Sequence, residues 1–71
     1  IDLYFIEDGQ LVIVDYKTDQ VLRGRAGEDE LRRRYSIQLD YYAMALSQIT
    51  GLKVKEKVIY SFALGRSLTV E

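Results

Sequence analysis

The chain contains no cysteine and no histidine among its 71 residues. Disulfides and thiolate metal sites are therefore excluded, and any metal bound by this chain would need oxygen ligands. A chain this short forms at most one domain and buries only ~60% of its unfolded surface, so its own core gives it little stability. The absence of cysteine agrees with a cytosolic location, although cysteine usage alone does not determine it.

Long apolar runs are also missing. No run approaches the ~20 residues of a membrane span, and no signal-peptide pattern occurs. The sequence has no phosphate-binding loop of the G-x-x-x-x-G-K-[ST] type, so we expect no ATP site of that kind in it. The chain starts at Ile1, already inside a strand-like run, and we therefore expect it to be a piece of a longer protein.

Neither sign of charge dominates, with 10 Lys and Arg against 11 Asp and Glu, so the net charge gives no support to nucleic-acid binding. Arginines nevertheless gather near the middle of the chain, at Arg23, Arg25, Arg32, Arg33 and Arg34. Three acidic residues, Glu28, Asp29 and Glu30, lie between them. One interpretation is a solvated helix start, where the helix dipole favours acidic groups. The other is an arginine patch that contacts a phosphate backbone.

Two apolar-rich runs, residues 1–7 and 10–17, flank the dipeptide Asp8-Gly9. Asp-Gly tolerates positive φ and favours a two-residue hairpin turn. With that turn, the numbers of each cross-strand pair sum to 17, which places Asp2 directly opposite Asp15. Directly opposed Cβ atoms lie ~4.5–5.5 Å apart, where like charges repel. Two such carboxylates require a cation between them or a raised pKa on one of them.

Lys17 follows Asp15 by two residues and therefore points to the same sheet face. A paired carboxylate next to an ammonium suits a hard divalent metal and a phosphate ester. Both faces of the two strands are apolar at mid-strand, so we expect the sheet to be covered on both sides.

The remaining segments predict a helix and further strands. Residues 18–27 read as a loop broken by glycines, and residues 28–50 as one helix, or as a short helix near residues 29–34 kinked before a longer one. Its apolar stripe consists of Leu31, Tyr35, Leu39, Tyr42, Leu46 and Ile49. Gly51 is a natural helix stop. Residues 54–64 predict a strand, residues 65–66 a turn, and residues 68–70 a short terminal strand. This order predicts an α/β fold in which a helix crosses one face of a mixed sheet.

The string Asp15-Tyr16-Lys17 at a strand end, with an acidic residue across the hairpin, resembles the PD-(D/E)xK nuclease superfamily. The longer string from Val14 to Asp19, followed by Tyr35-x-x-Gln38-Leu-x-x-Tyr42-Ala-x-Ala-Leu46, is similar to the RecB-type branch. Within that branch it resembles in particular the C-terminal nuclease domains of AddA-type helicase–nuclease subunits. The resemblance covers nearly all of the chain. It implies a restriction-endonuclease-like core fragment, incomplete at its N-terminus because the family's upstream helix with its histidine ligand is missing.

The resemblance also implies a metal site. Asp2 and Asp15 would coordinate Mg²⁺ or Mn²⁺, and the Tyr16 main-chain carbonyl would add a further oxygen ligand. Lys17 would lie beside the attacking water, orienting it or stabilising charge on phosphorus.

Gln38 and Tyr42, four residues apart on one helix face, match the family's Q-x-x-x-Y motif. The resemblance implies that they contact the DNA backbone or brace the site near Lys17. For other positions we favour a structural interpretation: we expect Tyr35 in the helix core, and Asp19 in an Asx-type turn rather than in contact with DNA.

The implied function is a metal-dependent exonuclease domain that hydrolyses phosphodiesters of single-stranded DNA. It would belong to an ATP-dependent helicase/nuclease of the bacterial cytoplasm that acts in double-strand-break repair and recombination. Its partners would be DNA, the ATP-binding helicase domains of the same chain and a second nuclease subunit. The alternatives are a catalytically silent domain that clamps DNA or scaffolds a complex, and a free-standing RecB-like exonuclease. Because the bare sheet face would be apolar, we expect the fragment to self-associate.

Overall fold

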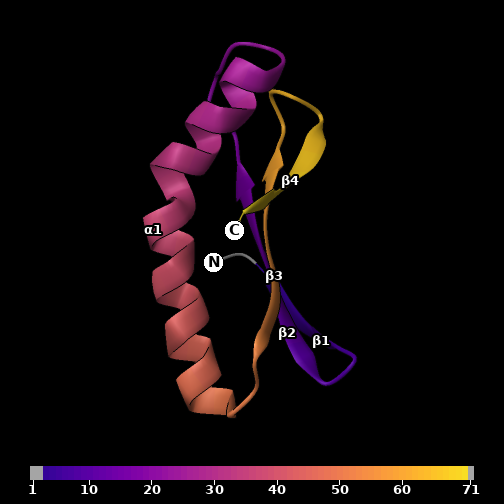
Figure 1. The fold of residues 1–71 in the computed structure, drawn as a ribbon. Coiled ribbons are helices and arrows are strands. Elements are labelled where there is room, and N and C mark those ends of the chain that lie inside the picture. The colour runs from indigo at the N-terminus through magenta and orange to yellow at the C-terminus, as the bar shows by residue number, and fades with distance from the viewer. Residues whose placement is uncertain (1–2, 71) are drawn as a thin grey trace.

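One helix lies along one face of a four-stranded sheet in the computed structural model, which describes residues 3–70 (Figure 1). The elements follow in the order β1 (Leu3–Glu7), β2 (Gln10–Lys17), α1 (Arg25–Thr50), β3 (Val54–Ser61) and β4 (Arg66–Val70). This confirms the predicted α/β fold with a mixed sheet. Within residues 3–70, no helix combines the length and the apolar character needed to cross a membrane.

The hairpin of β1 and β2 turns at Asp8 and Gly9, whose φ angles of 53° and 73° both lie in the left-handed region. The strands pair from Leu3↔Val14 to Glu7↔Gln10, so the predicted register is confirmed over these residues. Asp2, predicted to lie opposite Asp15, falls outside the described residues.

The sheet has the order β1-β2-β3-β4, and only the central pair, β2 and β3, is parallel. Parallel neighbours need a crossover connection, and α1 provides it. The carboxyl ends of β2 and β3 therefore meet at one end of the sheet, next to the start of α1 (Figure 1).

The helix is a single unbroken element, which decides between the two predicted alternatives, but it begins at Arg25 rather than at residue 28. Gly27, predicted in the loop, is buried in its first turns. A Cβ at Gly27 would lie 1.7 Å from the carbonyl oxygen of Leu22, so the loop packs against the helix where only glycine fits. Gly51 ends the helix as predicted, with φ 74° and its N–H donating to the Ser47 carbonyl at 2.8 Å.

The last two strands differ from their predicted bounds. β3 ends at Ser61 rather than at residue 64, and β4 begins at Arg66 rather than at residue 68. Ser61 explains the difference because it closes a turn: its carbonyl accepts the Gly65 N–H at 2.8 Å, and its hydroxyl accepts the Leu64 N–H at 3.0 Å.

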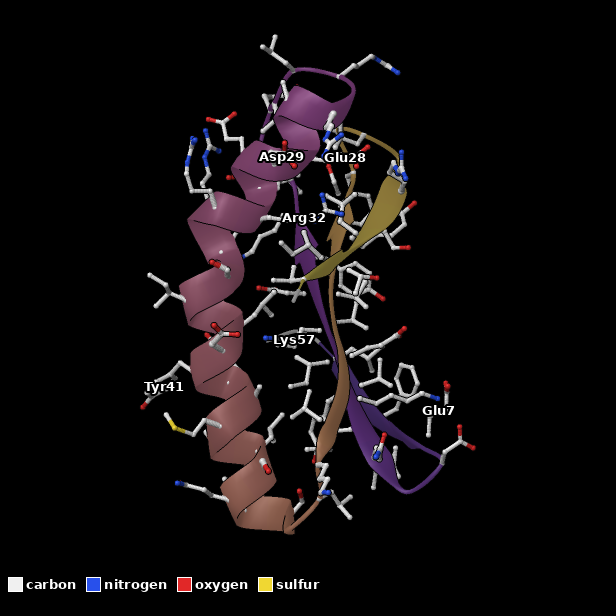
Figure 2. All side chains as sticks on the ribbon, in the orientation of Figure 1. Glu7, Glu28, Asp29, Arg32, Tyr41 and Lys57 are labelled. Atoms are coloured by element: carbon white, nitrogen blue, oxygen red, sulfur yellow. The ribbon has the colours of Figure 1, made fainter. Side chains whose placement is uncertain are left out.

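The core lies between α1 and the sheet. It consists of Ile13, Leu31, Leu39, Ala43, Ile59, Leu68 and Val70. Near its margin, Lys57 points from β3 toward α1 and donates to Asp40, whereas Tyr41 points away from the sheet (Figure 2). Ile49 was predicted in the buried stripe but is 80% exposed in the last helical turn. No helix in residues 3–70 covers the opposite sheet face, so the predicted cover on both sides is seen on one side only.

Candidate active site

Asp15 is buried, with 3% of its surface exposed, near the carboxyl end of β2. It pairs with Ile59 of β3 and shares the helix-covered face with Ile13, because side chains alternate along a strand. The Lys17 ammonium lies on the same face, and its Nζ is 3.1 Å from Asp15 Oδ2. The structure therefore brings the predicted carboxylate and ammonium together.

Lys17 has a second close neighbour, Tyr35 of α1, whose ring centroid is 4.2 Å from Nζ. Burial alone would lower the pKa of Lys17, but the hydrogen bond to Asp15 and its negative charge outweigh burial and hold that pKa above its ordinary value. Tyr35, predicted as a core residue, packs at the margin of the core and also reaches the site.

Asp19 lies in the loop that follows β2, and its carboxylate reaches back to α1. Its Oδ2 accepts the Tyr35 hydroxyl at 2.5 Å and Nη1 of Arg34 at 2.9 Å. The hydrogen bond from Tyr35 is the main cause that lowers the pKa of Asp19, and it also raises the pKa of Tyr35. The sequence placed Asp19 in a local turn and did not predict its bond to Tyr35. The one available signal was the position of Tyr35 one turn before Gln38.

Gln38 and Tyr42 contact each other, as Nε2 of Gln38 donates to the Tyr42 hydroxyl at 3.3 Å. Both side chains are partly buried. Positions three and four apart lie on one helix face, so these two residues lie along α1 on the same face as Tyr35. The residue of α1 that contacts Lys17 is Tyr35, which lies one turn closer to the loop.

Tyr16 directs its ring to the opposite sheet face, as strand alternation requires. There it packs edge-to-face against Tyr60 and in a tilted arrangement against Phe62, at centroid distances of 6.0 and 5.9 Å. Only the main chain of Tyr16 is thus available to a site on the Asp15 side.

The fit to a divalent metal rests on the Asp15 carboxylate and the Tyr16 carbonyl, both of which are hard oxygen donors. Among residues 3–70, no three Asp, Glu, His or Cys side chains gather closely enough to hold an ion. The second predicted carboxylate, Asp2, is not among those residues. Mg²⁺ commonly takes one or two carboxylates and completes its shell with water and substrate phosphate, so the described donors fit part of such a site.

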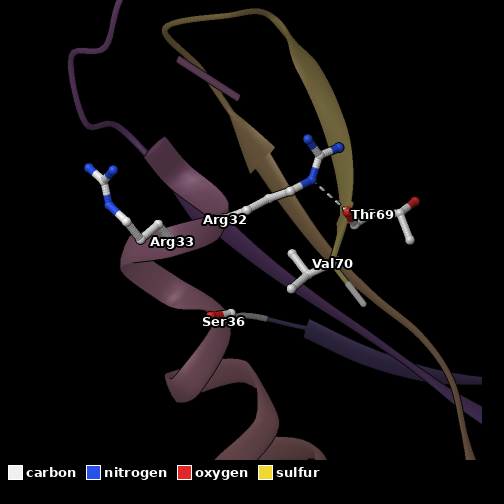
Figure 3. Close-up of a pocket in the computed structure, with 5 residues that line it drawn as sticks. All are labelled: Arg32, Arg33, Ser36, Thr69 and Val70. Atoms are coloured by element: carbon white, nitrogen blue, oxygen red, sulfur yellow. Dashed lines mark hydrogen bonds between the residues drawn. The ribbon is translucent and has the colours of Figure 1, made fainter. Parts of the chain in front are cut away.

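A separate cavity of about 580 Å³ lies between α1 and β4 (Figure 3). It is lined by Arg32, Arg33, Ser36, Thr69 and Val70. Nε of Arg32 donates to the Thr69 carbonyl at 3.0 Å, and its Nη1 lies 3.8 Å from Glu28 and 3.6 Å from Asp29. Arg33 and Arg34 both approach Glu30, at 3.7 and 2.9 Å. These pairings favour the first interpretation of the arginine cluster, a solvated helix start.

Comparison with known proteins gives a consistent result. The family profile described as "PD-(D/E)XK nuclease superfamily" matches residues 1–69. A subunit of the ATP-dependent helicase/nuclease of Lachnoclostridium phytofermentans is 52% identical over 71 residues, which is 100% of this chain and 5% of that protein. Subunits of the same name from Clostridium beijerinckii (43% over 70 residues, 99% of this chain, 6% of the relative) and Acetivibrio thermocellus (52% over 68 residues, 96% and 5%) are also similar. No solved structure matches the chain. The chain thus spans only 5 to 6% of the length of these relatives.

Proposed function

This chain belongs to the PD-(D/E)XK nuclease superfamily, and we propose that it carries the phosphodiester-cleaving site of a metal-dependent DNA exonuclease. The observation that supports this most is the buried Asp15 carboxylate held 3.1 Å from the Lys17 ammonium at the carboxyl end of β2. Burying a charged pair costs desolvation energy that apolar residues would not incur. Such a pair is therefore expected where chemistry requires it.

Within this site, Asp15 and the Tyr16 carbonyl would hold Mg²⁺ or Mn²⁺, together with Asp2. When bound, the ion would polarise the phosphoryl oxygen and lower the pKa of the attacking water. Lys17 would donate hydrogen bonds to the attacking water or to the phosphate oxygens and stabilise the charge that develops there. Gln38 and Tyr42, already joined by a hydrogen bond, would contact the DNA backbone along α1.

We propose that the 71 residues form part of a nuclease domain at the C-terminal end of a larger helicase–nuclease. The name and length of the relatives, which are helicase/nuclease subunits about twenty times longer than this chain, support the larger parent, and the C-terminal position follows only from the family resemblance. The substrate would be single-stranded DNA released by the helicase domains, and a second nuclease subunit would complete the complex. The proposed setting is double-strand-break repair and recombination in the bacterial cytoplasm.

The test measures Mn²⁺ binding and digestion of single-stranded DNA by the full-length protein and its Asp15→Ala and Lys17→Ala variants. We expect Asp15→Ala to lose the bound Mn²⁺, and both variants to slow digestion by ~10³-fold or more, as removal of residues that act as a unit does elsewhere. Asp8→Asn is the matched control: Asp8 lies on the same hairpin, is 81% exposed in its side chain, and its replacement tolerates positive φ.

Limited proteolysis of the same preparations reports whether the nuclease domain folds in each variant. Digestion by Asp15→Ala at the rate of the unmodified protein would contradict the proposal. DNA binding that needs no metal and leads to no cleavage would instead identify a silent DNA clamp.

A further inference from the structure

The Lys17 ammonium is held by two contacts. Asp15 Oδ2 lies 3.1 Å from Nζ, and the centroid of the Tyr35 ring lies 4.2 Å from Nζ. A cation within about 6 Å of an aromatic centroid is attracted to the ring face, and more strongly where water is excluded. The Lys17 side chain is only 18% exposed, so the ring restricts a flexible four-carbon chain that has little solvent around it.

Tyr35 is itself held by the loop that follows β2. Its hydroxyl donates to Asp19 at 2.5 Å, and Arg34 donates to the same carboxylate oxygen at 2.9 Å. The second guanidinium nitrogen of Arg34 donates to Glu30, also at 2.9 Å. The ring that faces Lys17 is thus fixed at both ends, by the core on one side and by a charged network on the other.

Resting on the proposed function, we infer that Tyr35 is a positioning residue for Lys17 and that Asp19 anchors it. The geometry supports this because the Tyr35 hydroxyl and ring contact different partners: the hydroxyl contacts the loop and the ring contacts the ammonium. A residue that served the core alone would need neither contact. Displacement of a reacting group by about 1 Å can cost ~10²-fold in rate, so restraint of the ammonium has a measurable consequence.

The experiment is a double-mutant cycle on kcat and KM for single-stranded DNA, in the full-length protein. Tyr35→Leu removes the ring, and we expect kcat to fall ~10- to 100-fold with KM unchanged, as on loss of an orienting partner. Tyr35→Phe keeps the ring but loses the bond to Asp19, and it should lower kcat about three- to tenfold, less than Tyr35→Leu. In a Lys17→Ala background, Tyr35→Leu should cause no further fall. Ile37→Ala, on the outer side of the same helix and 80% exposed before substitution, is the matched control and should leave both constants unchanged.

Asp19→Asn provides a second route if Tyr35→Leu does not fold, because Asp19 lies in a loop. It should lower kcat about three- to tenfold with Lys17 present and have no effect with Lys17→Ala.

Equal losses in both backgrounds would overturn the inference, since Tyr35 would then act independently of Lys17. A rise in KM at constant kcat would also overturn it, by showing a DNA contact. Failure of the proposed function is distinguishable, because the unmodified protein would then not cleave DNA or would do so without need of Asp15.

Discussion

The two faces of the sheet carry similar amounts of apolar side chain but differ in their surroundings. Under α1, Ile13, Ile59 and Leu68 are at most 1% exposed, and Asp15 is buried among them. On the opposite face, the Tyr16, Tyr60 and Phe62 rings contact one another, mostly edge-to-face, yet Phe62 remains 59% exposed and Tyr16 43%. Cover by α1 therefore explains why these side chains are buried and the rings of Tyr16 and Phe62 are not, although Val12 on the open face is also buried, at 3%.

The covered face carries both the buried core and the proposed site, whereas the open face carries neither. On the covered face, the buried core and the proposed site share one layer, because Asp15 and Lys17 continue the register of Leu11 and Ile13 along β2. A change in the core there reaches the site directly. On the open face, the exposed aromatic side chains contribute surface rather than core.

The largest expected effect comes from Ile59→Ala on the covered face. Truncation of a fully buried Ile leaves a cavity and should lower the free energy of unfolding by ~2–5 kcal/mol, with Ile59→Val as a milder step of ~0.5–1.5 kcal/mol. Phe62→Ala on the open face should cost about 1 kcal/mol or less, because its ring is largely in solvent already. Urea unfolding of the 71-residue chain measures all three. Equal losses for Ile59→Ala and Phe62→Ala would remove the distinction between the faces.

The next expected effect, of intermediate size, is on the self-association of the chain. The open face exposes the apolar side chains of Leu3, Phe5, Tyr16 and Phe62, and exposed apolar surface of this kind marks an interface. We expect light scattering to report about twice the monomer mass or more at high concentration, and Phe5→Lys with Phe62→Lys to return the mass to that of a monomer. Ile37→Lys, on the outer helix surface and 80% exposed before substitution, is the control and should not change the mass. A monodisperse monomer from the unmodified chain would contradict this expectation.

The smallest expected effect is on the pH dependence of the free energy of unfolding, and it comes from the Asp19–Tyr35 hydrogen bond next to α1. The hydrogen bond from Tyr35 lowers the pKa of Asp19 below its ordinary 3.8. Because the folded state holds the ionised form more tightly, this pairing stabilises the fold above pH 3.8, and the stabilisation is lost as pH falls through the lower folded pKa. Asp19→Asn should therefore flatten the decline of the free energy of unfolding below pH 3.8, and Tyr35→Phe should reduce it in part. If the free energy of unfolding of Asp19→Asn declined below pH 3.8 as it does in the unmodified chain, the hydrogen bond would add no stability.

Most of the fold could be predicted from the sequence because its signals are local. Asp8-Gly9 sets the hairpin register through its backbone geometry, and Gly51 ends the helix in the left-handed conformation expected of it. The errors arose where tertiary contacts outweigh local preference. Gly27 looks like a loop residue, but it is buried in α1 because the Leu22 carbonyl leaves no room for a Cβ. Ser61 ends β3 early by bonding the turn that follows it.

The site was predictable in part for a similar reason. Asp15 and Lys17 lie two apart on one strand, so alternation alone places them on one face. Their contact with Tyr35, and the bond from Tyr35 to Asp19, join a strand end, a loop and a helix. The docking angle of α1 determines those distances, and no sequence spacing contains it. The roles of Asp2, Asp15, Lys17, Gln38 and Tyr42 in catalysis stay predictions.

The parallel pairing of β2 with β3 has a consequence for how the chain folds. The β1–β2 hairpin closes through a two-residue turn, whereas β3 can join β2 only after the whole of α1 has been traversed. Contacts between segments so distant in sequence form late and slow the overall rate. We therefore expect the hairpin to form early, with Asp15 still in water, and the charged side chain to lose its hydration only when the crossover closes.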